Sequence, residues 1–544
     1  MNRVCLRCRA AAAARRPRGT TTTTTTTAAH AITRRSFADA RRPSVAPKCI
    51  IDIKHIRQNA DLYARTCVER NYPQQASHPA RIVAAHYQWQ QLQSQGRSLR
   101  ERSNALQKIL ADADAAAQDR AGAQAEARQL KQQLSTIEKG EAAAVAEMQA
   151  LALALPNLTS AETPVGDEPT VLSYINTAED GGRHVSSSRR SHVDIGAELG
   201  VLDFAAAATS SGWGWYYLVG DAARLELALV SYALDVATRH GWTQVSPPSM
   251  VYSHIGSACG FQPRDAHPPP PSSSSAAEAQ QQPGSQIYTI AQSPTDAARG
   301  VPQLCLAGTS EISLAAMYAN TTLPHSPPSS PSSSSSSSSS ASASASAQLP
   351  LKRVAVSRCY RAEAGARGSE TRGLYRVHEF TKVELFAWTR PDPSATNDTF
   401  DEMLDMQTEI LQSLDLPCRV LEMPSGDLGA SAVRKVDMEA WFPGRGAEGS
   451  WGELTSASIC TDYQTRRLNT RVRLHEASLA AGGGGGAGGG SGGKLGFPWT
   501  VNATALAVPR VIAALMENGW DEASRSVAIP EVLRPWMGGK DRMS

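Results

Sequence analysis

The stretch that decides the fold runs from 358 to 386 and reads RCYRAEAG at 358–365, GLYRVHEF at 373–380 and KVELF at 382–386. Valines alternate with other residues before it, and Val383 and Leu385 alternate with charged residues after it, which is the period-two pattern of strands. The small and charged residues from 364 to 373 suit a loop. We therefore predict an antiparallel hairpin.

Two arginines mark the ends of this predicted loop, Arg361 before it and Arg376 after it. Fixed cations at such a place can stabilise negative charge that develops during a reaction, as it does on the α-phosphate and the departing pyrophosphate when an adenylate forms. The hairpin is therefore a candidate site for chemistry at phosphates.

A long helical region precedes the hairpin. Between Ala84 and Leu155 apolar residues recur in two rows at helical spacing, which predicts two amphipathic helices. The Ala- and Asp-rich stretch 112–122 predicts a reversal, so that the pair forms an antiparallel coiled-coil arm. The pattern leaves open whether this arm binds RNA or mediates dimerisation. The rows contain Leu92, Leu99, Leu106 and Leu110, then Leu130, Leu134, Ile137, Val145, Met148 and Leu155, with Glu141 as an interruption.

The first 48 residues have the composition of a transit peptide. They contain ten Arg, one Lys and one acidic residue, Asp39, together with a run of threonines from Thr20 to Thr27. We predict import into the mitochondrial matrix, with a plastid or dual targeting as the alternative. Without this segment, 43 basic and 50 acidic residues remain, a formal charge of −7. Any affinity for RNA must then come from local patches of positive charge.

The rest of the composition fits a globular protein of two or three domains. The chain has 544 residues, of which 41% are hydrophobic. No apolar run approaches the roughly 20 residues of a membrane span, so no membrane partner is expected. The nine cysteines lack a repeated metal-ligand spacing, and the Cys5–Cys8 pair inside the predicted presequence is ascribed to chance.

Three low-complexity segments interrupt the second half of the chain. We predict disordered surface insertions at about 263–284, which is rich in Pro, Ser and Gln, at 324–349, which is mostly Ser, Pro and Ala, and at 481–493, a glycine run. They are interpreted as insertions at loop tips that carry no chemistry.

Further motifs accompany the hairpin in a fixed order. This set of motifs resembles that of the class II aminoacyl-tRNA synthetases, and the sequence around the hairpin is similar to that of the seryl-tRNA synthetases. The resemblance extends over nearly everything from Ile50 onward. The motifs are HVDIG at 192–196, HGW at 240–242 through Pro248, GTSE at 308–311, the hairpin itself, DMEAW at 437–441, GELTS at 452–456, DYQTRR at 462–467 and NATALAVPR at 502–510.

The resemblance implies an α+β fold, with an antiparallel sheet flanked by helices and an N-terminal coiled-coil arm. It implies a homodimer that activates L-serine with ATP and Mg²⁺ and then charges tRNA-Ser, with the arm on the tRNA. The expected division is 1–48 for the transit peptide, 49–165 for the arm and 166–544 for the catalytic domain.

The resemblance also assigns a serine site. Glu311 and Thr309 would hold the α-amino group, and Arg361 would bind the carboxylate and the α-phosphate. Glu384 and Thr504 would bind the serine hydroxyl, so that alanine leaves these groups unpaired and is rejected. Ser310 and Ser456 complete this expected site.

An ATP site follows in the same way. Phe380 and Arg510 would sandwich adenine, and Glu363 would bind the adenine amino group. Glu453 would hold Mg²⁺ together with the phosphates. Arg361, Arg376 and Arg510 are the expected catalytic residues. The other expected ATP contacts are Ala362, Val377, His378, Glu379, Leu454, Thr455 and Ser456.

Two features depart from this picture. Ala362 stands where serine is more usual, which should matter little if the backbone faces the nucleotide. His254-Ile255-Gly256-Ser257 is similar to a signature of class I synthetases, but the fourth residue is not histidine and no KMSKS loop follows. We ascribe this match to chance and expect no Rossmann fold.

Two other classes of protein compete with an active enzyme. One is a catalytically silent, synthetase-like RNA-binding or regulatory protein, and the other is a coiled-coil scaffold. The charged residues of the expected site suit the chemistry, which argues against the first. The roughly 380 residues after the arm argue against the second.

Overall fold

The computed structural model describes residues 46–111, 117–177, 188–261, 287–323, 349–362, 373–474 and 494–544. The predicted presequence, apart from its last three residues, lies outside them, as does the Cys5–Cys8 pair. The insertions predicted at 263–284 and 481–493, and all of 324–349 except Leu349, also lie outside. Throughout the described residues, every helix is too short or too polar to cross a lipid bilayer.

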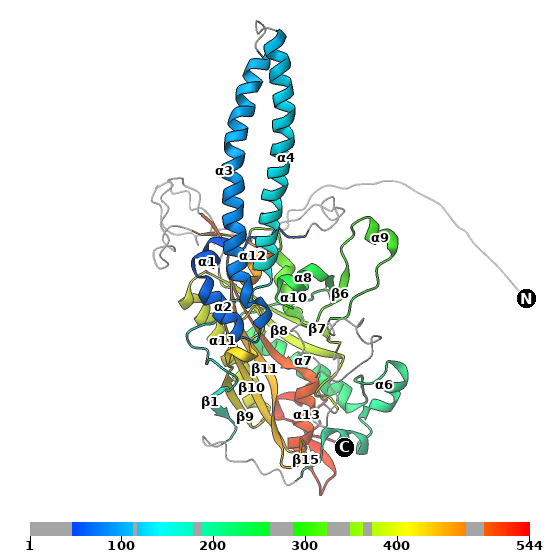
Figure 1. Ribbon diagram of the computed structural model, residues 1–544. Coiled ribbons are helices and arrows are strands. Elements are labelled where there is room, and N and C mark those ends of the chain that lie inside the picture. The colour runs from blue at the N-terminus through cyan, green and yellow to red at the C-terminus, as the bar shows by residue number, and fades with distance from the viewer. Residues whose placement is uncertain are drawn as a thin grey trace, which may run out of the picture. The chain divides into compact units, whose positions relative to one another are not determined.

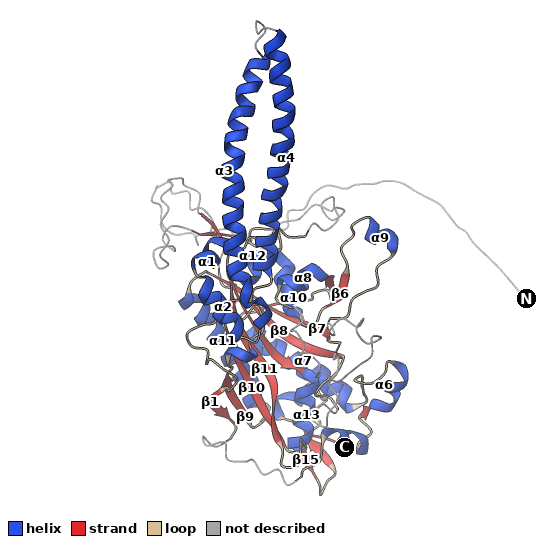
Figure 2. Cartoon of the chain, in the orientation of Figure 1, coloured by secondary structure: helices blue, strands red, loops and turns tan. Residues whose placement is uncertain are grey.

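An eight-stranded sheet forms the centre of the fold (Figures 1 and 2). Neighbouring strands run antiparallel, except that β4 and β7 are parallel. The prediction of an antiparallel sheet flanked by helices is therefore confirmed, and a parallel Rossmann sheet is excluded. In order across the sheet the strands are β1 (Thr170–Ile175), β9 (Cys418–Glu422), β10 (Arg434–Phe442), β11 (Ser450–Thr461), β14 (Trp499–Ala507), β8 (Glu379–Thr389), β7 (Leu351–Tyr360) and β4 (Thr243–Val245).

The predicted hairpin is the pair β7 and β8. The two strands pair from Leu351 opposite Trp388 to Tyr360 opposite Glu379, without a register shift. The loop between them falls mostly on 363–372, outside the described residues. The period-two pattern thus identified both strands correctly.

Three helices cover one face of this sheet, namely α7 (Asp221–Arg239), α11 (Pro393–Ser413) and α13 (Val508–Gly519). Their apolar stripes form the main core together with alternate residues of the central strands, such as Val383 and Leu385 of β8 and Ala503 and Ala505 of β14. Because side chains alternate along a strand, the residues between these point to the opposite face. That face carries the polar side chains.

Shorter elements surround the polar face. α8 (Ser253–Ala258), β5 (Met250–Tyr252), β6 (Leu304–Leu306) and α10 (Ser310–Ala315) share a second core with Phe386 and Trp388. His254 of α8 stacks on Tyr252, with ring centroids 5.5 Å apart, in a helix that packs into this core. The class I interpretation of His254 is excluded by the sheet topology.

The arm consists of α3 (His78–Ala111) and α4 (Ala117–Leu153), which lie side by side (Figure 1). The helix α3 begins six residues before the predicted start. The predicted reversal at 112–122 was too long, because α4 already begins at Ala117 and the alanines there favour a helix. Glu141 does not interrupt the packing, since it accepts hydrogen bonds from Arg100 at 3.0 and 3.2 Å.

The base of the arm is anchored on the sheet domain. Met148, Leu151 and Leu155 pack with Ile56 and Ile82, and this cluster includes Ala430 and Tyr463 of the sheet domain.

The remaining elements are α1 (Ile53–Gln58), α2 (Ala60–Glu69), η2 (Pro73–Ser77), α5 (His192–Glu198), β2 (Leu202–Asp203), α6 (Phe204–Ser210), β3 (Tyr217–Leu218), α9 (Pro294–Ala298), η3 (Ala316–Tyr318), η5 (Ser425–Asp427), α12 (Tyr463–Leu468), β12 (Val472–Leu474), β13 (Lys494–Gly496), β15 (Trp520–Asp521), β16 (Ser526–Ala528), η7 (Glu531–Leu533) and β17 (Arg542–Met543).

Candidate functional site

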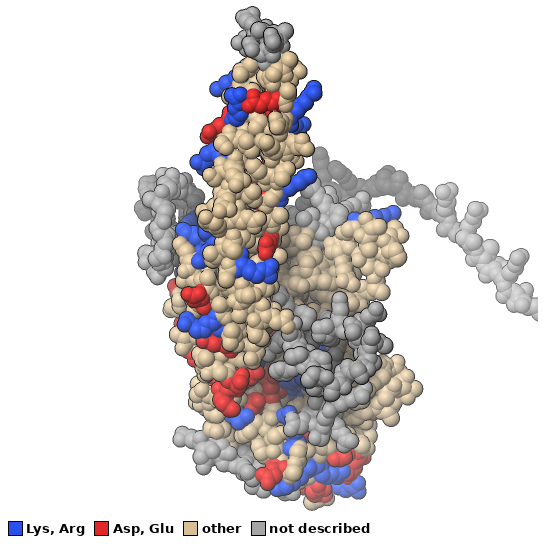
Figure 3. All heavy atoms as spheres, in the orientation of Figure 1, with Lys and Arg blue, Asp and Glu red and all other residues tan. Residues whose placement is uncertain are grey.

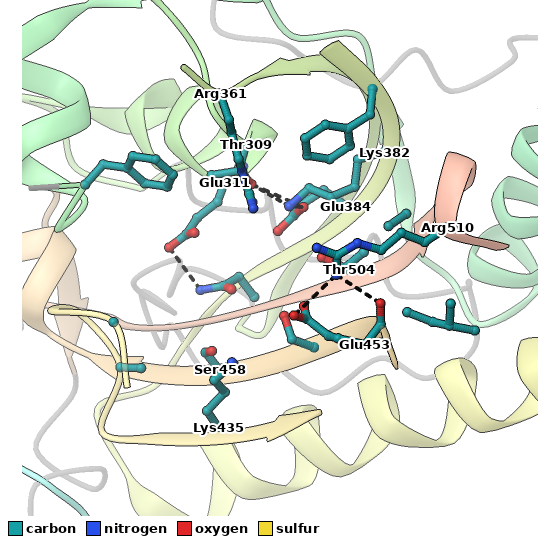
Figure 4. A pocket seen from close by; sticks show the side chains of 18 of the residues that line it. Thr309, Glu311, Arg361, Lys382, Glu384, Lys435, Glu453, Ser458, Thr504 and Arg510 are labelled. Atoms are coloured by element: carbon teal, nitrogen blue, oxygen red, sulfur yellow. Dashed lines mark hydrogen bonds and ion pairs between the residues drawn. The ribbon is translucent and has the colours of Figure 1, made fainter. Parts of the chain in front are cut away.

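A cavity of about 410 Å³ lies on the polar face of the sheet, between the central strands, α10 and the start of α13 (Figure 4). Most of the residues predicted from the sequence line it. These are Thr309, Glu311, Arg361, Arg376, Val377, Phe380, Glu384, Glu453, Leu454, Ser456, Thr504 and Arg510.

A row of paired residues crosses the central strands, and three of its members, Glu384, Thr504 and Ser456, line the floor of the cavity. Glu384 of β8 pairs with Thr504 of β14, and Ser456 of β11 pairs with Asp437 of β10. Ala457 pairs with Ala503, so the antiparallel register also places Ser456 beside Thr504. Four residues that are far apart in the sequence thus become neighbours.

A β-bulge at Thr504 shapes this row. The register of β14 against β8 shifts between Thr504 and Leu506. Behind the bulge, the fully buried Gln407 of α11 donates to the carbonyl of Ser456 at 3.0 Å and to that of Thr504 at 2.8 Å. The amide satisfies backbone acceptors that an irregular ladder leaves open.

Glu311 lies on α10, whose N-cap is Thr309. Gln464 of α12 donates to Glu311 Oε1 at 2.5 Å, and Asn502 of β14 donates to the same oxygen at 3.1 Å. Among the described residues no donor reaches Oε2. Burial and the nearby charge of Glu384 raise the pKa of Glu311 to about 7, although Lys382 opposes the shift. The cavity therefore contains a carboxyl group that an incoming cation can hold in its ionised form.

Lys382 and Glu384 form a buried ion pair on one face of β8, with side chains 7% and 2% exposed. The Lys382 ammonium also donates to Thr309 Oγ1 at 2.6 Å, and Thr309 donates to Glu384 at 3.4 Å. Burial raises the pKa of Glu384, and Lys382 counteracts this. The Thr309 hydroxyl additionally accepts from the Glu311 N–H as a helix cap, so its hydrogen bonds are made within the protein.

Arg361 and Phe380 face each other across the hairpin. The guanidinium carbon of Arg361 lies 5.2 Å from the centre of the Phe380 ring, and Arg361 Nε reaches the carbonyl of Gly308 at 3.5 Å. These contacts place a cation on the α10 side of the cavity, close to Glu311 and Glu384 (Figure 4).

Arg510 and Glu453 form the opposite side. Arg510 Nη1 lies 3.3 Å from the Glu453 carboxylate and donates to the Glu453 carbonyl at 2.9 Å. Burial would raise the pKa of Glu453, but Arg510, Lys435 and Arg361 together lower it to about 2. Glu453 is therefore an anion at neutral pH. Among the described residues no group of three or more His, Cys, Asp and Glu side chains could hold a metal ion, so a cation here would need other ligands as well.

Several predicted residues do not line the cavity. His378 stacks on Trp215 with centroids 5.8 Å apart, and its Nδ1 lies 2.7 Å from the Tyr288 hydroxyl. Glu379 lies 3.6 Å from Arg358. Ser310, Thr455 and Ala362 are also absent from the lining. Glu363 lies outside the described residues.

The structure adds residues to which the sequence analysis gave no role. Lys382, Lys435, Ser458 and Asn502 line the cavity, and Gln464 reaches it through Glu311. The sequence could have pointed to Lys382, because this charged residue stands beside the alternating Val383 and Leu385 in a strand that is expected to be buried. Lys435 lies 2.6 Å from Asp437, and burial raises the pKa of Asp437 to about 7 in spite of this ion pair.

Comparison with known proteins finds similarity in both sequence and fold. Residues 50–159 match the seryl-tRNA synthetase N-terminal domain, and residues 339–480 match the tRNA synthetase class II core domain (G, H, P, S and T). The chain is similar to the mitochondrial serine–tRNA ligase of Schizosaccharomyces pombe, with 35% identity over 90% of this chain and 88% of the relative. The mitochondrial serine–tRNA ligase of Saccharomyces cerevisiae is 39% identical over 71% of this chain and 72% of the relative. A crystal structure of seryl-tRNA synthetase from Pyrococcus horikoshii complexed with ATP aligns with a TM-score of 0.72 and 27% identity, over 91% of this chain and 99% of that one.

Proposed function

This chain belongs to the seryl-tRNA synthetase family, and on that premise we propose which of its residues carry each step. The protein is a serine–tRNA ligase, which activates serine with ATP and charges tRNA-Ser. In the first step a serine carboxylate oxygen attacks the α-phosphorus of ATP, the bond from that phosphorus to the bridging oxygen breaks, and pyrophosphate leaves. In the second step a hydroxyl of the ribose at the 3′-end of the tRNA attacks the carbonyl carbon of the seryl group, the bond from that carbon to the phosphate oxygen breaks, and AMP leaves.

The cluster of Glu311, Glu384 and Arg361 carries the proposal for serine. A free amino acid has an ammonium and a carboxylate, and this cavity offers Glu311 Oε2 to the first and Arg361 to the second (Figure 4). Thr504 and Glu384 are adjacent on the floor of the cavity and would bind the side-chain hydroxyl. The role of Thr309 is to hold Lys382 and Glu384 in place, because its hydroxyl is already engaged with them.

The proposal for ATP places the nucleotide along β8 and the start of α13. Phe380 would stack on the adenine, with Arg510 on the other side of it, and Arg361 would contact the α-phosphate while Arg376 receives the pyrophosphate. Val377 and Leu454 supply the walls. Glu363, expected to bind the adenine amino group, belongs to this proposal.

Glu453 fits a role in holding Mg²⁺. Its pKa of about 2 keeps it ionised, and its side chain lines the cavity beside Arg510. Because the described residues contain no group of three or more His, Cys, Asp and Glu side chains that could hold a metal ion, Mg²⁺ would need the phosphates as further ligands, which is the usual way in which it binds at nucleotide sites. The ion would neutralise charge on the phosphates of ATP.

Serine-dependent exchange of pyrophosphate into ATP tests this proposal. We expect exchange with serine and little with threonine or alanine. No exchange with serine would refute the adenylation mechanism.

The arm, within the proposed segment 49–165, would bind tRNA-Ser through shape and backbone contacts. Among the described residues of the arm, Arg81, Arg100 and Arg102 form ion pairs, since they lie 2.9, 3.0 and 2.6 Å from glutamates of α4. Figure 3 accordingly shows basic and acidic residues mixed along the arm. The exposed basic residues outside these pairs, which include Arg97, Lys108, Lys131 and Lys139, are better candidates for phosphate contacts.

We also propose that the active form is a homodimer. Large apolar side chains are exposed on α7 and on the chain that leads into it, with Leu227 66% exposed, Tyr217 48% and Val219 45%. Leu227→Glu should yield monomers in sedimentation velocity if this face is the interface. A dimer that survives Leu227→Glu would place the interface elsewhere.

The protein is mitochondrial, as are the two fungal relatives by name. We propose the matrix as the compartment and 1–48 as the presequence. The catalytic domain would then be 166–544. Fusing 1–48 to a fluorescent protein tests the presequence, and a fusion that stays in the cytosol would contradict it.

A further inference from the structure

A buried histidine and glutamate lie behind the cavity, at residues to which the chemistry above assigns no role. His192 is the first residue of α5 and Glu517 lies in the last turn of α13. Their side chains are 4% and 1% exposed, and His192 Nδ1 lies 2.7 Å from Glu517 Oε1. A negative charge near the C-terminal end of a helix is electrostatically unfavourable, and burial adds to the cost. Such a pair therefore needs strong compensation.

The compensation comes from three separate segments of the chain. Glu517 accepts the backbone N–H of His192 at 3.1 Å on Oε1 and that of Gly444 at 2.8 Å on Oε2. On the other side of the imidazole, the N–H of Leu374 points to His192 Nε2 at 3.0 Å. Because a backbone N–H can only donate, Nε2 must be the acceptor, so Nδ1 carries the proton and donates to Glu517.

The segment that His192 holds is the exit of the hairpin loop. Gly373 has φ +73° and passes so close to the imidazole that a Cβ there would lie 2.1 Å from His192 Nε2. Leu374 is fully buried, and the next residues, Tyr375 and Arg376, line the cavity. The histidine thus fixes the backbone two residues before Arg376.

Helix α13 holds this segment at two points. Glu517 acts through His192, and Arg510, two turns earlier on the same helix, donates to the Tyr375 carbonyl at 3.3 Å. The backbone just before Arg376 is therefore held to α13 directly by Arg510 and indirectly through His192. Glu311, Lys382 and Glu384 are held by other elements, namely α10, α12, β8 and β14.

We propose that His192, supported by Glu517, is a positioning residue for the nucleotide side of the site, which aligns Arg376 with Arg510 and leaves the serine side unaffected. This inference rests on the proposed roles of Arg376 and Arg510 in binding ATP.

Two substitutions separate the two hydrogen bonds of the imidazole. The amide N–H of His192→Asn can replace Nδ1 and keep the bond to Glu517, but it leaves the Leu374 N–H unpaired. The longer His192→Gln can place its amide oxygen near Nε2 and keep the bond to Leu374. His254→Asn is the matched control, since His254 is a partly buried histidine of α8 that does not line the cavity.

The KM values for ATP and for serine in pyrophosphate exchange, with active sites counted by the adenylate burst, test the proposal on the full chain. We expect His192→Asn to raise KM for ATP roughly tenfold, the cost of one unpaired buried N–H. KM for serine should change less than about threefold, and His192→Gln and His254→Asn should keep KM for ATP within about threefold, well under the loss of one hydrogen bond.

Three results would overturn the proposal: equal changes in both KM values, an unchanged KM for ATP in His192→Asn, or a KM for ATP raised as much in His192→Gln as in His192→Asn. If His192→Asn does not fold, His192→Gln still decides, because a raised KM for ATP contradicts the role of the Leu374 bond and an unchanged one supports it. Failure of the proposed function is a different outcome, in which the unmodified chain shows no exchange or Arg376→Ala leaves KM for ATP unchanged.

Discussion

Protonation of Glu311 should control the use of serine near neutral pH. With a pKa of about 7, the carboxyl group is roughly nine-tenths ionised at pH 8 and one-tenth ionised at pH 6. The ammonium of free serine stays protonated over this range, so only the ionised carboxylate binds it well. We expect kcat/KM for serine in pyrophosphate exchange to fall about tenfold from pH 8 to pH 6, in proportion to the ionised fraction.

Glu311→Gln tests the same group by substitution. Its amide oxygen can still accept from Gln464 and Asn502, which both reach Oε1, while the NH₂ group replaces Oε2 and opposes the ammonium. Loss of a charge-assisted hydrogen bond of about 2–3 kcal/mol lowers kcat/KM roughly 30- to 150-fold. The pH dependence between 6 and 8 should disappear with it.

Ionisation of Glu311 favours the use of serine but opposes folding. The pKa of Glu311 is higher in the folded chain than in the unfolded one, so ionisation lowers folding stability as the pH rises from the unfolded value towards 7. Glu311→Gln should therefore raise Tm at pH 8 more than at pH 5. For the pH dependence of kcat/KM the control is Asp437→Asn, because the pKa of Asp437 is also raised to about 7 but its carboxyl group pairs with Lys435 and does not line the cavity. Two results would refute the assignment to Glu311. One is a kcat/KM for serine that does not change between pH 6 and pH 8 in the unmodified chain. The other is a pH dependence of kcat/KM that persists in Glu311→Gln and vanishes in Asp437→Asn.

Three further experiments test other parts of the molecule. Lys382→Met should lower the free energy of unfolding in urea by about 3 kcal/mol, because it leaves the buried Glu384 without its cation, and adding Glu384→Gln should recover much of that loss. Thr504→Ala should reduce the preference for serine over alanine in pyrophosphate exchange roughly tenfold, the worth of one hydrogen bond; an unchanged preference would remove Thr504 from the hydroxyl site. Replacing Arg97, Lys108, Lys131 and Lys139 with alanine should weaken tRNA charging and reduce its salt dependence by about one unit of slope per lost phosphate contact, whereas Arg102→Ala, which removes the partner of Glu126, should have little effect on either.

The sequence was sufficient for the elements whose pattern is local. The hairpin strands follow from alternation around Val383 and Leu385, and the arm follows from its rows of leucines. The length of the reversal in the arm was wrong because Ala-rich sequence suits a helix as well as a turn, and packing between α3 and α4 decides between them. Glu141 was interpreted as a break for a similar reason, since its partner Arg100 lies on the other helix.

The arrangement within the site depended on tertiary contacts that a motif does not encode. A motif names His378 beside Phe380, but only the fold shows that Trp215 and Tyr288 hold His378 away from the cavity. Likewise, the register between β14 and β8 makes Thr504 a neighbour of Glu384, although 120 residues separate them in the sequence. The engagement of the Thr309 hydroxyl by Lys382 could not be inferred, because Lys382 was not recognised as part of the site.

The charged residues of the serine site select for amino acids, whereas the contacts to the serine hydroxyl select serine among them. Glu311, Glu384, Lys382 and Arg361 carry two negative and two positive charges when ionised, and a zwitterionic amino acid adds none, so binding does not leave an uncompensated charge in the cavity. Alanine and threonine carry the same two charged groups, so this set can select for amino acids but not for serine. Selection for serine must then depend on the uncharged contacts, where Thr504 and Glu384 lose a partner if the hydroxyl is missing. Lys382 connects the two functions, because it neutralises Glu384 and so allows a second carboxylate to lie beside Glu311.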